Sequence, residues 1–256
     1  MTDSFKEKFR QAVAETETVV YSYLPEETGH QKTIFEAMNY SVKAGGKRLR
    51  PLLMREVYRL FGGNGPEIGP FMAAMEMIHT SSLIHDDLPC MDNDEYRRGK
   101  LTTWKAYGYD MAVLAGDALM IYAFEVASKA FTMGADPEKV GRAIGILAEK
   151  TGIYGMIGGQ TVDVELTGKA VPREKLDFIY RLKTGALLEA SMMIGAVLAG
   201  ASDEEIREVE TMASEVGLAF QIQDDILDVT STQEELGKPV LSDEKNQKTC
   251  LLYTSP

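Results

Sequence analysis

Hydrophobic positions recur with helical spacing along almost the whole chain. Between residues 3 and 24, Phe5, Phe9, Val13 and Val20 fall on a similar face, which is typical of an amphipathic helix. Further helices are predicted over 32–44, from Pro51 to about Phe61, from Gly69-Pro70 to Leu88, and at about 109–131, 136–157, 173–198 and 202–229. Convincing strands, repeats and long linkers are absent. The pattern therefore predicts an all-α fold, with residues 1–256 forming a single large helical bundle.

Two of these helices carry acidic residues on a face that is otherwise apolar. In 70–88 the stripe consists of Met72, Met75, His79, Ser82 and Asp86, at a three-and-four spacing. In 202–229 a capping box of Ser202 and Glu205 precedes an apolar stripe. That stripe runs through Ile206, Val209, Ala213, Gly217 and Phe220 and then reaches Asp224 and Asp228.

A carboxylate on a buried face is costly unless it is paired or binds a metal. Two such helices meeting in a bundle would line a cavity with oxygen ligands, which suit Mg²⁺. The motifs are Asp86-Asp87-Leu-Pro-Cys-Met-Asp92 and Asp224-Asp225-Ile-Leu-Asp228. Either motif alone could be a solvated acidic helix end, whereas two at the ends of apolar stripes favour a metal site. Neither fits the twelve-residue calcium loop of an EF-hand.

Basic residues cluster twice in a chain whose net charge is −12. Lys47, Arg48 and Arg50 follow a glycine pair, and Arg97-Arg98-Gly99-Lys100 follows the first acidic motif. Such clusters suit phosphate oxygens, although either alone could be ordinary surface charge. The net charge argues against a nucleic-acid partner. No P-loop or strand-linked GxGxxG indicates a nucleotide.

The remaining features indicate a reducing compartment. Cys90 and Cys250 are too few for a disulfide framework and have no metal-binding spacing. The charged N-terminus lacks the apolar core of a signal peptide, and no run of about 18 apolar residues occurs. We therefore expect a cytoplasmic protein without membrane insertion.

Several motifs in order resemble the trans-isoprenyl diphosphate synthases of the short-chain farnesyl/geranylgeranyl type. They are GGKRLRP (45–51), EMIH (76–79), LIHDDLPCMDND (83–94), RRGK (97–100), AGDAL (115–119), GMIGGQ (155–160), KTG (183–185), FQIQDDILD (220–228) and GKP (237–239). The resemblance covers roughly residues 30–249. It implies an all-α bundle around a deep central cavity, normally a homodimer. The implied reaction condenses isopentenyl diphosphate with dimethylallyl or geranyl diphosphate to make a C15 or C20 product.

The resemblance also implies a role for individual residues. Three Mg²⁺ ions would be held principally by Asp86, Asp92 and Asp224, with Asp87, Asp225 and Asp228 in support. Arg97, Lys183 and Lys238 would bind the allylic diphosphate, and Gly46, Lys47, Arg50, His79 and Arg98 would hold isopentenyl diphosphate. Thr184 and Gln221 would face the reacting carbons beside Lys183, and Gln160 would line the same cavity. A lone His on an apolar stripe is more often a core residue, but EMIH favours substrate contact for His79.

Product length depends, by the same resemblance, on the residues four and five before Asp86. These are Ser82 and Ser81, and two small side chains leave room for a C20 product. The two extra residues between Asp87 and Asp92 are instead typical of short-chain enzymes. The prediction is therefore C15 or C20.

Some positions depart from the family pattern. Leu101 and Trp104 stand where proline and histidine are usual, and residues 250–256 do not continue the resemblance. Family members usually have a further helical portion there, so the sequence predicts a chain without those C-terminal helices. Two alternatives remain open: a terpene cyclase, which would not need Lys47, Arg50, His79 and Arg98, and a non-catalytic helical subunit of a prenyltransferase.

Overall fold

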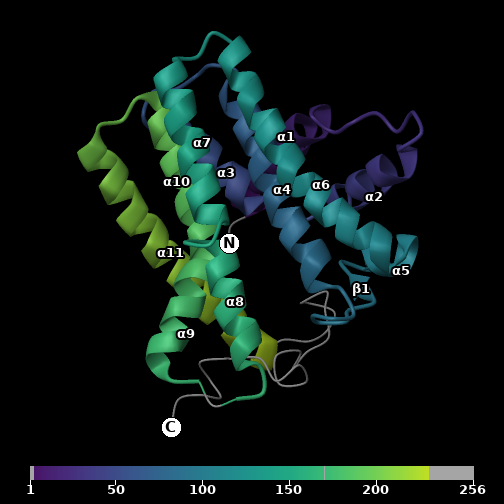
Figure 1. Ribbon diagram of the computed structural model, residues 1–256. Coiled ribbons are helices and arrows are strands. Elements are labelled where there is room, and N and C mark those ends of the chain that lie inside the picture. Colours follow the sequence, from purple (N-terminus) through teal and green to yellow (C-terminus); the bar gives the residue numbers. More distant parts are fainter. Residues whose placement is uncertain (1–2, 170, 231–256) are drawn as a thin grey trace.

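The computed structural model describes residues 3–169 and 171–230, and within them the chain is almost entirely helical (Figure 1). The helices are α1 (Asp3–Ser22), α2 (Lys32–Val42), α3 (Leu49–Leu60), α4 (Ile68–Asp86), α5 (Thr103–Tyr107), α6 (Tyr109–Ser128), α7 (Pro137–Thr151), α8 (Met156–Leu166), α9 (Arg173–Ile179), α10 (Ala186–Ala199) and α11 (Asp203–Thr230). A 3₁₀ turn, η1 (Lys129–Thr132), follows α6, and a π turn, η2 (Tyr180–Gly185), joins α9 to α10. The predicted all-α fold is confirmed.

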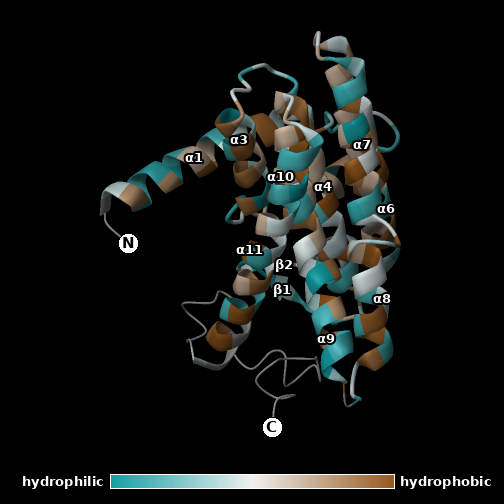
Figure 2. Cartoon of the chain, turned by 90° about the vertical axis from the view of Figure 1, so that its left-hand side faces the viewer, coloured by the Kyte–Doolittle hydropathy of each residue, from teal (hydrophilic) through white to brown (hydrophobic). Residues whose placement is uncertain are grey.

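Two helices, α4 and α10, form the centre of the bundle. Both are apolar around most of their circumference, as expected of helices surrounded by others; most of α4 and nearly all of α10 is buried. Helix α4 packs against α6 and α3, while α10 packs against α3, α7 and α11. A Cβ at Gly195 would lie 2.4 Å from the Met54 carbonyl oxygen, so only glycine permits this closeness of α10 to α3. Helix α1 extends outward from this body (Figure 2).

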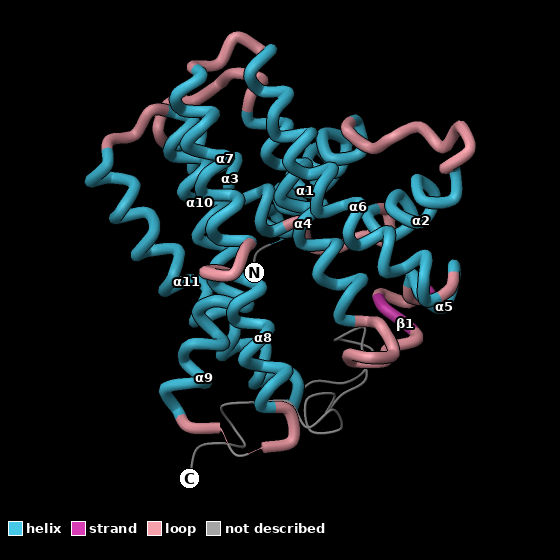
Figure 3. Tube along the Cα trace, viewed as in Figure 1, coloured by secondary structure: helices cyan, strands magenta, loops and turns pink. Residues whose placement is uncertain are grey.

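The expectation that strands are absent was wrong for one short segment. Tyr96–Arg97 (β1) and Lys100–Leu101 (β2) pair antiparallel beside α5 (Figure 3). The turn between them uses left-handed backbone at Arg98 (φ 53°) and Gly99 (φ 75°), as tight two-residue hairpins require. The strands are too short for an alternation of apolar and polar residues to be visible in the sequence. The hairpin presents the RRGK segment to the end of α4.

The helix predicted over 136–157 is two helices. It breaks between Gly152 and Gly155, and the chain restarts as α8 at Met156. A Cβ at Gly155 would lie 2.0 Å from the Lys150 carbonyl oxygen, so the tight turn depends on glycine. The helical spacing of the apolar residues continues across the turn, and for this reason the sequence pattern predicts a single helix. The break redirects α8 so that Gln160 faces the end of α4.

Within residues 3–169 and 171–230, two stretches are long and apolar enough to cross a membrane, although neither is an unbroken run of apolar residues. The first is Tyr109–Thr132, with 39% of its apolar window buried inside the protein. The second is Arg173–Ala199, with 83% of its apolar window buried. Core helices of a bundle pass the same test of length and composition. The second stretch is such a core helix, and the first keeps one face exposed.

Candidate active site

The first acidic motif lies where α4 ends. Pro89 cannot continue the helix, and the chain turns back so that the Asp92 amide donates to the Asp86 carbonyl oxygen at 2.8 Å. The main chain of Asp92 therefore lies next to that of Asp86. Gln160 on α8 donates from Nε2 to Asp86 Oδ1 at 2.7 Å, which fixes one carboxylate oxygen. Asp92 and Gln160 also line a common pocket with Asp163.

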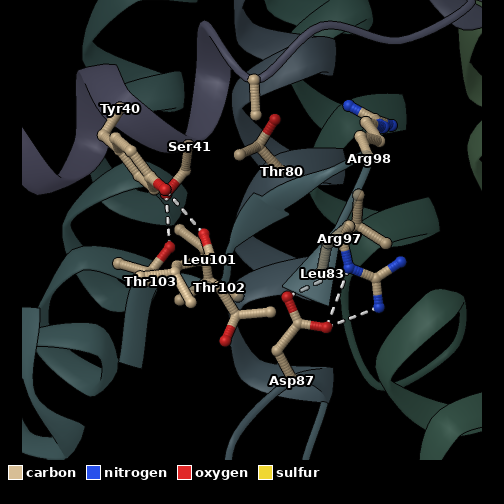
Figure 4. A pocket seen from close by; sticks show the side chains of 12 residues that line it. Tyr40, Ser41, Thr80, Leu83, Asp87, Arg97, Arg98, Leu101, Thr102 and Thr103 are labelled. Atoms are coloured by element: carbon tan, nitrogen blue, oxygen red, sulfur yellow. Dashed lines mark hydrogen bonds and ion pairs between the residues drawn. The ribbon is translucent and has the colours of Figure 1, made fainter. Parts of the chain in front are cut away.

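Asp87 points away from the other two carboxylates and holds Arg97. The Arg97 Nε donates to Asp87 Oδ1 and Oδ2 at 2.8 and 3.0 Å, and Nη2 donates to Oδ1 at 2.5 Å (Figure 4). Burial raises the pKa of Asp87 to about 6, although the Arg97 guanidinium acts in the opposite direction. This forked pair fastens the β1–β2 hairpin to the end of α4.

A cavity of about 670 Å³ opens beside the acidic motif. Its polar wall includes Asp86, Gln160, Lys183 and Thr184, and its apolar wall includes Met91, Met120, Met156, Ile157 and Leu187. The cavity thus combines charged and polar groups with a large apolar lining. Such a cavity suits a ligand with an anionic head and an apolar chain.

A second cavity of about 370 Å³ adjoins the first and has several cations in its lining. Its walls include Gly46, Lys47, Arg48, Arg50, Glu76, His79 and Arg98. Arg50 and His79 line both cavities, so the two spaces meet at these side chains. The cationic lining makes the second cavity an anion site.

Arg50 offers a buried donor that an anion could satisfy. Its Nη1 donates to His79 Nε2 at 3.3 Å, but within the described part of the chain its buried Nε has no hydrogen-bond partner. Burial, opposed by Glu76 and reinforced by Arg98, lowers the Arg50 pKa to about 10. A phosphate oxygen would satisfy the buried donor and offset the excess positive charge.

His79 is held in its neutral form. Arginine can only donate, so the Nε2 atom facing Arg50 is the acceptor nitrogen of the ring. Burial and the charges of Arg50, Arg98, Arg97 and Arg48 lower the His79 pKa well below its usual value.

Gly46 and Arg98 meet at the rim of the second cavity. The guanidinium of Arg98 donates to the Gly45 carbonyl oxygen, and a Cβ at Gly46 (φ 142°) would lie 2.8 Å from its Nη1. Gly46 therefore makes room for the Arg98 side chain. The glycine pair and the RRGK segment, 50 residues apart in the sequence, are neighbours here.

The guanidinium of Arg48 is turned into the protein and does not face the anion site. The sequence pattern, which groups Arg48 with Lys47 and Arg50, did not show this difference. Its side chain is 0% exposed and donates to Glu17 and Tyr21 of α1, to Glu76 of α4 and to the Val42 carbonyl oxygen. The backbone at Arg48 is left-handed (φ 48°). Arg48 therefore anchors the loop from inside while Lys47 and Arg50 stay on the cavity wall.

The π turn η2 presents Lys183 and Thr184 to the first cavity. Lys183 Nζ donates to Asp163 Oδ2 of α8 at 2.6 Å, and Thr184 Oγ1 donates to Gln221 Oε1 of α11 at 2.9 Å. Turns of this type often occur at functional sites because they shift side chains out of helical register. Asp163 was not predicted, and its only signal in the sequence is its position one turn after Gln160.

Ser82 and Ser81 have different surroundings. Ser82 lines the first cavity, whereas Ser81 is fully buried and donates its hydroxyl to the Ile78 carbonyl oxygen. Asp224 lies on α11, half-buried. Lys238 and residues 250–256 lie outside the described residues, as do the side chains of Asp225 and Asp228.

The donor set fits Mg²⁺. Asp86 and Asp92 each offer carboxylate oxygens near Gln160, which orients the first of them and lines a pocket with the second. Within the described ranges no group of three or more His, Cys, Asp or Glu side chains is close enough to hold a metal alone. Mg²⁺ does not need such a group, because it binds through one or two carboxylates, waters and substrate phosphates.

Comparison with known proteins places these features in a family. Residues 31–255 match the family described as Polyprenyl synthetase. The chain is 52% identical over 206 residues to the chloroplastic geranylgeranyl pyrophosphate synthase of Catharanthus roseus, covering 80% of this chain and 57% of that protein. It is 45% identical over 247 residues to the farnesyl diphosphate synthase of Geobacillus stearothermophilus, covering 96% and 82%.

The chain thus spans a little over half the length of the plant relative. Its fold matches the crystal structure of a geranyltransferase from Helicobacter pylori complexed with magnesium and isoprenyl diphosphate. The TM-score is 0.82 and the identity 32%, covering 98% of this chain and 84% of the other. With the motifs, the fold and the family match in agreement, the chain belongs to the polyprenyl synthetase family.

Proposed function

We propose that the protein is a prenyltransferase that condenses isopentenyl diphosphate head-to-tail with dimethylallyl or geranyl diphosphate. The observation that carries the proposal is the pair of cavities that meet at Arg50 and His79. One has carboxylates and a long apolar wall, as an allylic diphosphate needs. The other is cationic, as the diphosphate of a second substrate needs. A terpene cyclase has a single substrate and would not need the second cavity.

The allylic substrate would place its diphosphate near Asp86 and Lys183 and its chain among the methionines of the first cavity. Arg97, which lines a different pocket and pairs with Asp87, would join them. Bound by Asp86, Asp92 and Asp224, Mg²⁺ would neutralise the diphosphate charge and make it a better leaving group. We propose three such ions, with Asp87, Asp225 and Asp228 in support. Lys183 and Arg97 add positive charge where the leaving group develops negative charge.

The residues around the reacting carbons have two tasks. The Thr184–Gln221 pair presents oxygen dipoles toward the place where positive charge develops, which stabilises it. Leu187, Met91 and Met156 keep water out of the apolar part. Lys47, Arg50 and Arg98 would hold isopentenyl diphosphate so that its double bond faces that carbon. The allylic C–O bond would break to release diphosphate, and the double bond of isopentenyl diphosphate would form the new C–C bond. The released diphosphate then accepts the proton that the condensed product loses, so no protein nucleophile is needed.

The product is C15 or C20. Ser82 leaves space in the cavity wall, and the cavity of about 670 Å³ is large enough for a prenyl chain. The relatives include enzymes named for both lengths.

We also propose a homodimer that works in the cytoplasm. The outer face of α6 exposes Leu114 and Ile121, which are 54% and 72% accessible. Large exposed side chains on one helix face are typical of an interface. The molar mass in solution, measured by light scattering, tests this: a monomer at working concentration contradicts it.

The central test is incubation of the purified chain with Mg²⁺, isopentenyl diphosphate and dimethylallyl diphosphate. We expect elongation to C15 or C20, read by chromatography of the dephosphorylated products. Asp86→Asn should lower kcat by about 100-fold or more, because metal binding supplies several kcal/mol of transition-state stabilisation. The matched control Asp177→Asn alters an exposed aspartate on α9 and should leave kcat unchanged.

The alternatives give different results in the same assay. A cyclic hydrocarbon formed from a longer diphosphate without isopentenyl diphosphate would indicate a terpene cyclase. Absence of Mg²⁺-dependent diphosphate release by the chain alone would favour a non-catalytic subunit.

A further inference from the structure

The ion pair between Asp163 and Lys183 joins two elements of the site that the sequence motifs treat separately. Asp163 lies on α8, one turn after Gln160, and its side chain is 9% exposed. Lys183 lies on η2 and its side chain is 24% exposed at the cavity wall. A buried carboxylate is stable only if it is paired, and the ammonium at 2.6 Å supplies the partner.

The main chains of the same two elements are also in direct contact. A Cβ at Gly159 would lie 2.4 Å from the Lys183 backbone nitrogen and 2.9 Å from the Leu182 carbonyl carbon. On the other side of η2, a Cβ at Gly217 of α11 would lie 3.1 Å from the Gly185 Cα. The backbone of η2 is therefore packed closely against α8 at Lys183 and against α11 at Gly185, so the position of the Lys183 ammonium depends on its side-chain conformation.

Helix α8 thus positions both a carboxylate and an ammonium group of the site. Its Gln160 orients Asp86, and its Asp163, three residues after Gln160, orients Lys183. Lysine has a flexible stem and a compact charge, so without a fixed partner its ammonium can reach other carboxylates. The nearby acidic motif would then be occupied by lysine in competition with Mg²⁺.

We propose that Asp163 is a positioning residue that holds the Lys183 ammonium beside the allylic diphosphate and away from the metal-binding carboxylates. The inference rests on the proposed function. Asp163 acts through Lys183 and touches neither substrate. Its loss should weaken the use of Mg²⁺ and of the allylic substrate together, while isopentenyl diphosphate, which the other cavity would bind, should be unaffected.

The test compares Asp163→Asn with the wild type in steady-state kinetics at varied Mg²⁺ and varied concentrations of each substrate. We expect the Mg²⁺ concentration at half-maximal rate and the KM for geranyl diphosphate to rise about 10- to 100-fold, the usual effect of removing a supporting partner. The KM for isopentenyl diphosphate should stay within about twofold. The control Asp177→Asn removes an exposed aspartate from α9.

A double-mutant cycle with Lys183→Ala separates positioning from other roles. If Asp163 acts only through Lys183, the double variant should be no worse than Lys183→Ala alone. Multiplicative losses would overturn the proposal, as would an equal rise in KM for both substrates or constants matching the control. Melting temperatures report folding. If Asp163→Asn does not fold, Asp163→Glu, which keeps the charge but shifts it, is judged by the same comparison between substrates.

Failure of the proposed function gives a different result. A wild type that neither elongates nor binds geranyl diphosphate with Mg²⁺ in calorimetry would overturn the function and the positioning role with it. A wild type that elongates normally while Asp163→Asn is unchanged would overturn the positioning role alone.

Discussion

At the scale of single residues, the unusual state of His79 has a measurable consequence. Its pKa is lowered in the folded protein, whereas in the unfolded chain it is near 6.5. The unfolded state therefore binds more protons as the pH falls below about 6.5, so the contribution of His79 to stability is complete above that pH and is lost below it.

We expect the free energy of unfolding of the wild type to fall faster between pH 7 and 5 than that of His79→Gln. The difference in slope cannot exceed about 1.4 kcal/mol per pH unit, the limit for one proton. Chemical denaturation at several pH values, without Mg²⁺ or diphosphate, measures it. Parallel curves for the two proteins would show that His79 is not held neutral.

Residue types and spacing indicated the acidic motif at Asp86 and the basic cluster at Lys47 and Arg50, whereas the resemblance to the family supplied the roles expected of His79 and Lys183. Asp86, Arg50, His79 and Lys183 line the two cavities, and Asp92 lines a separate pocket with Gln160 and Asp163. The sequence did not reveal which charges are satisfied by protein, because pairing depends on contacts between distant segments. Asp163 and Arg48 have ordinary sequence contexts, and their roles come from Lys183 and from Glu17 and Glu76.

At the scale of elements, glycine decides how closely α8 and η2 approach. In Gly159→Ala the added methyl group would meet the Lys183 backbone nitrogen, so one of the two elements must shift. We expect a loss of about 1–3 kcal/mol of stability, typical of overpacking, and a lower kcat. The control Gly141→Ala on α7 adds a methyl group with no atom within 4 Å and should stabilise by about 0.5–1 kcal/mol. Thermal unfolding distinguishes the two.

The positions of helices were predictable from apolar spacing, but their interruptions were not. The capping box of Ser202 and Glu205 starts α11 as predicted, with Ser202 N donating to Glu205 Oε2 at 2.7 Å. The turn at Gly152–Gly155 and the π turn of η2 leave the apolar period almost intact, so the sequence pattern passes through both. These interruptions carry Gln160 and Lys183 into the site.

At the scale of the whole molecule, the cavities depend on an ion-pair network whose side chains do not line them. Lys150 of α7 donates to Glu189 of α10 and to Glu210 of α11, so these contacts link the three helices. Burial opposes the charge of Lys150, and the two carboxylates outweigh it and raise its pKa. This network holds α11 against the centre of the bundle, and α11 carries Gln221.

The buried Arg48 has a practical consequence for where the folding unit begins. The family match starts at residue 31, yet Glu17 and Tyr21 of α1 lie before that boundary and hold the Arg48 side chain. A fragment cut at the family boundary would leave an arginine in the protein interior with part of its countercharge deleted, a loss of about 3–5 kcal/mol. We expect that fragment to melt well below the full chain in circular dichroism. Trimming the first residues of α1, before Glu7, should be harmless.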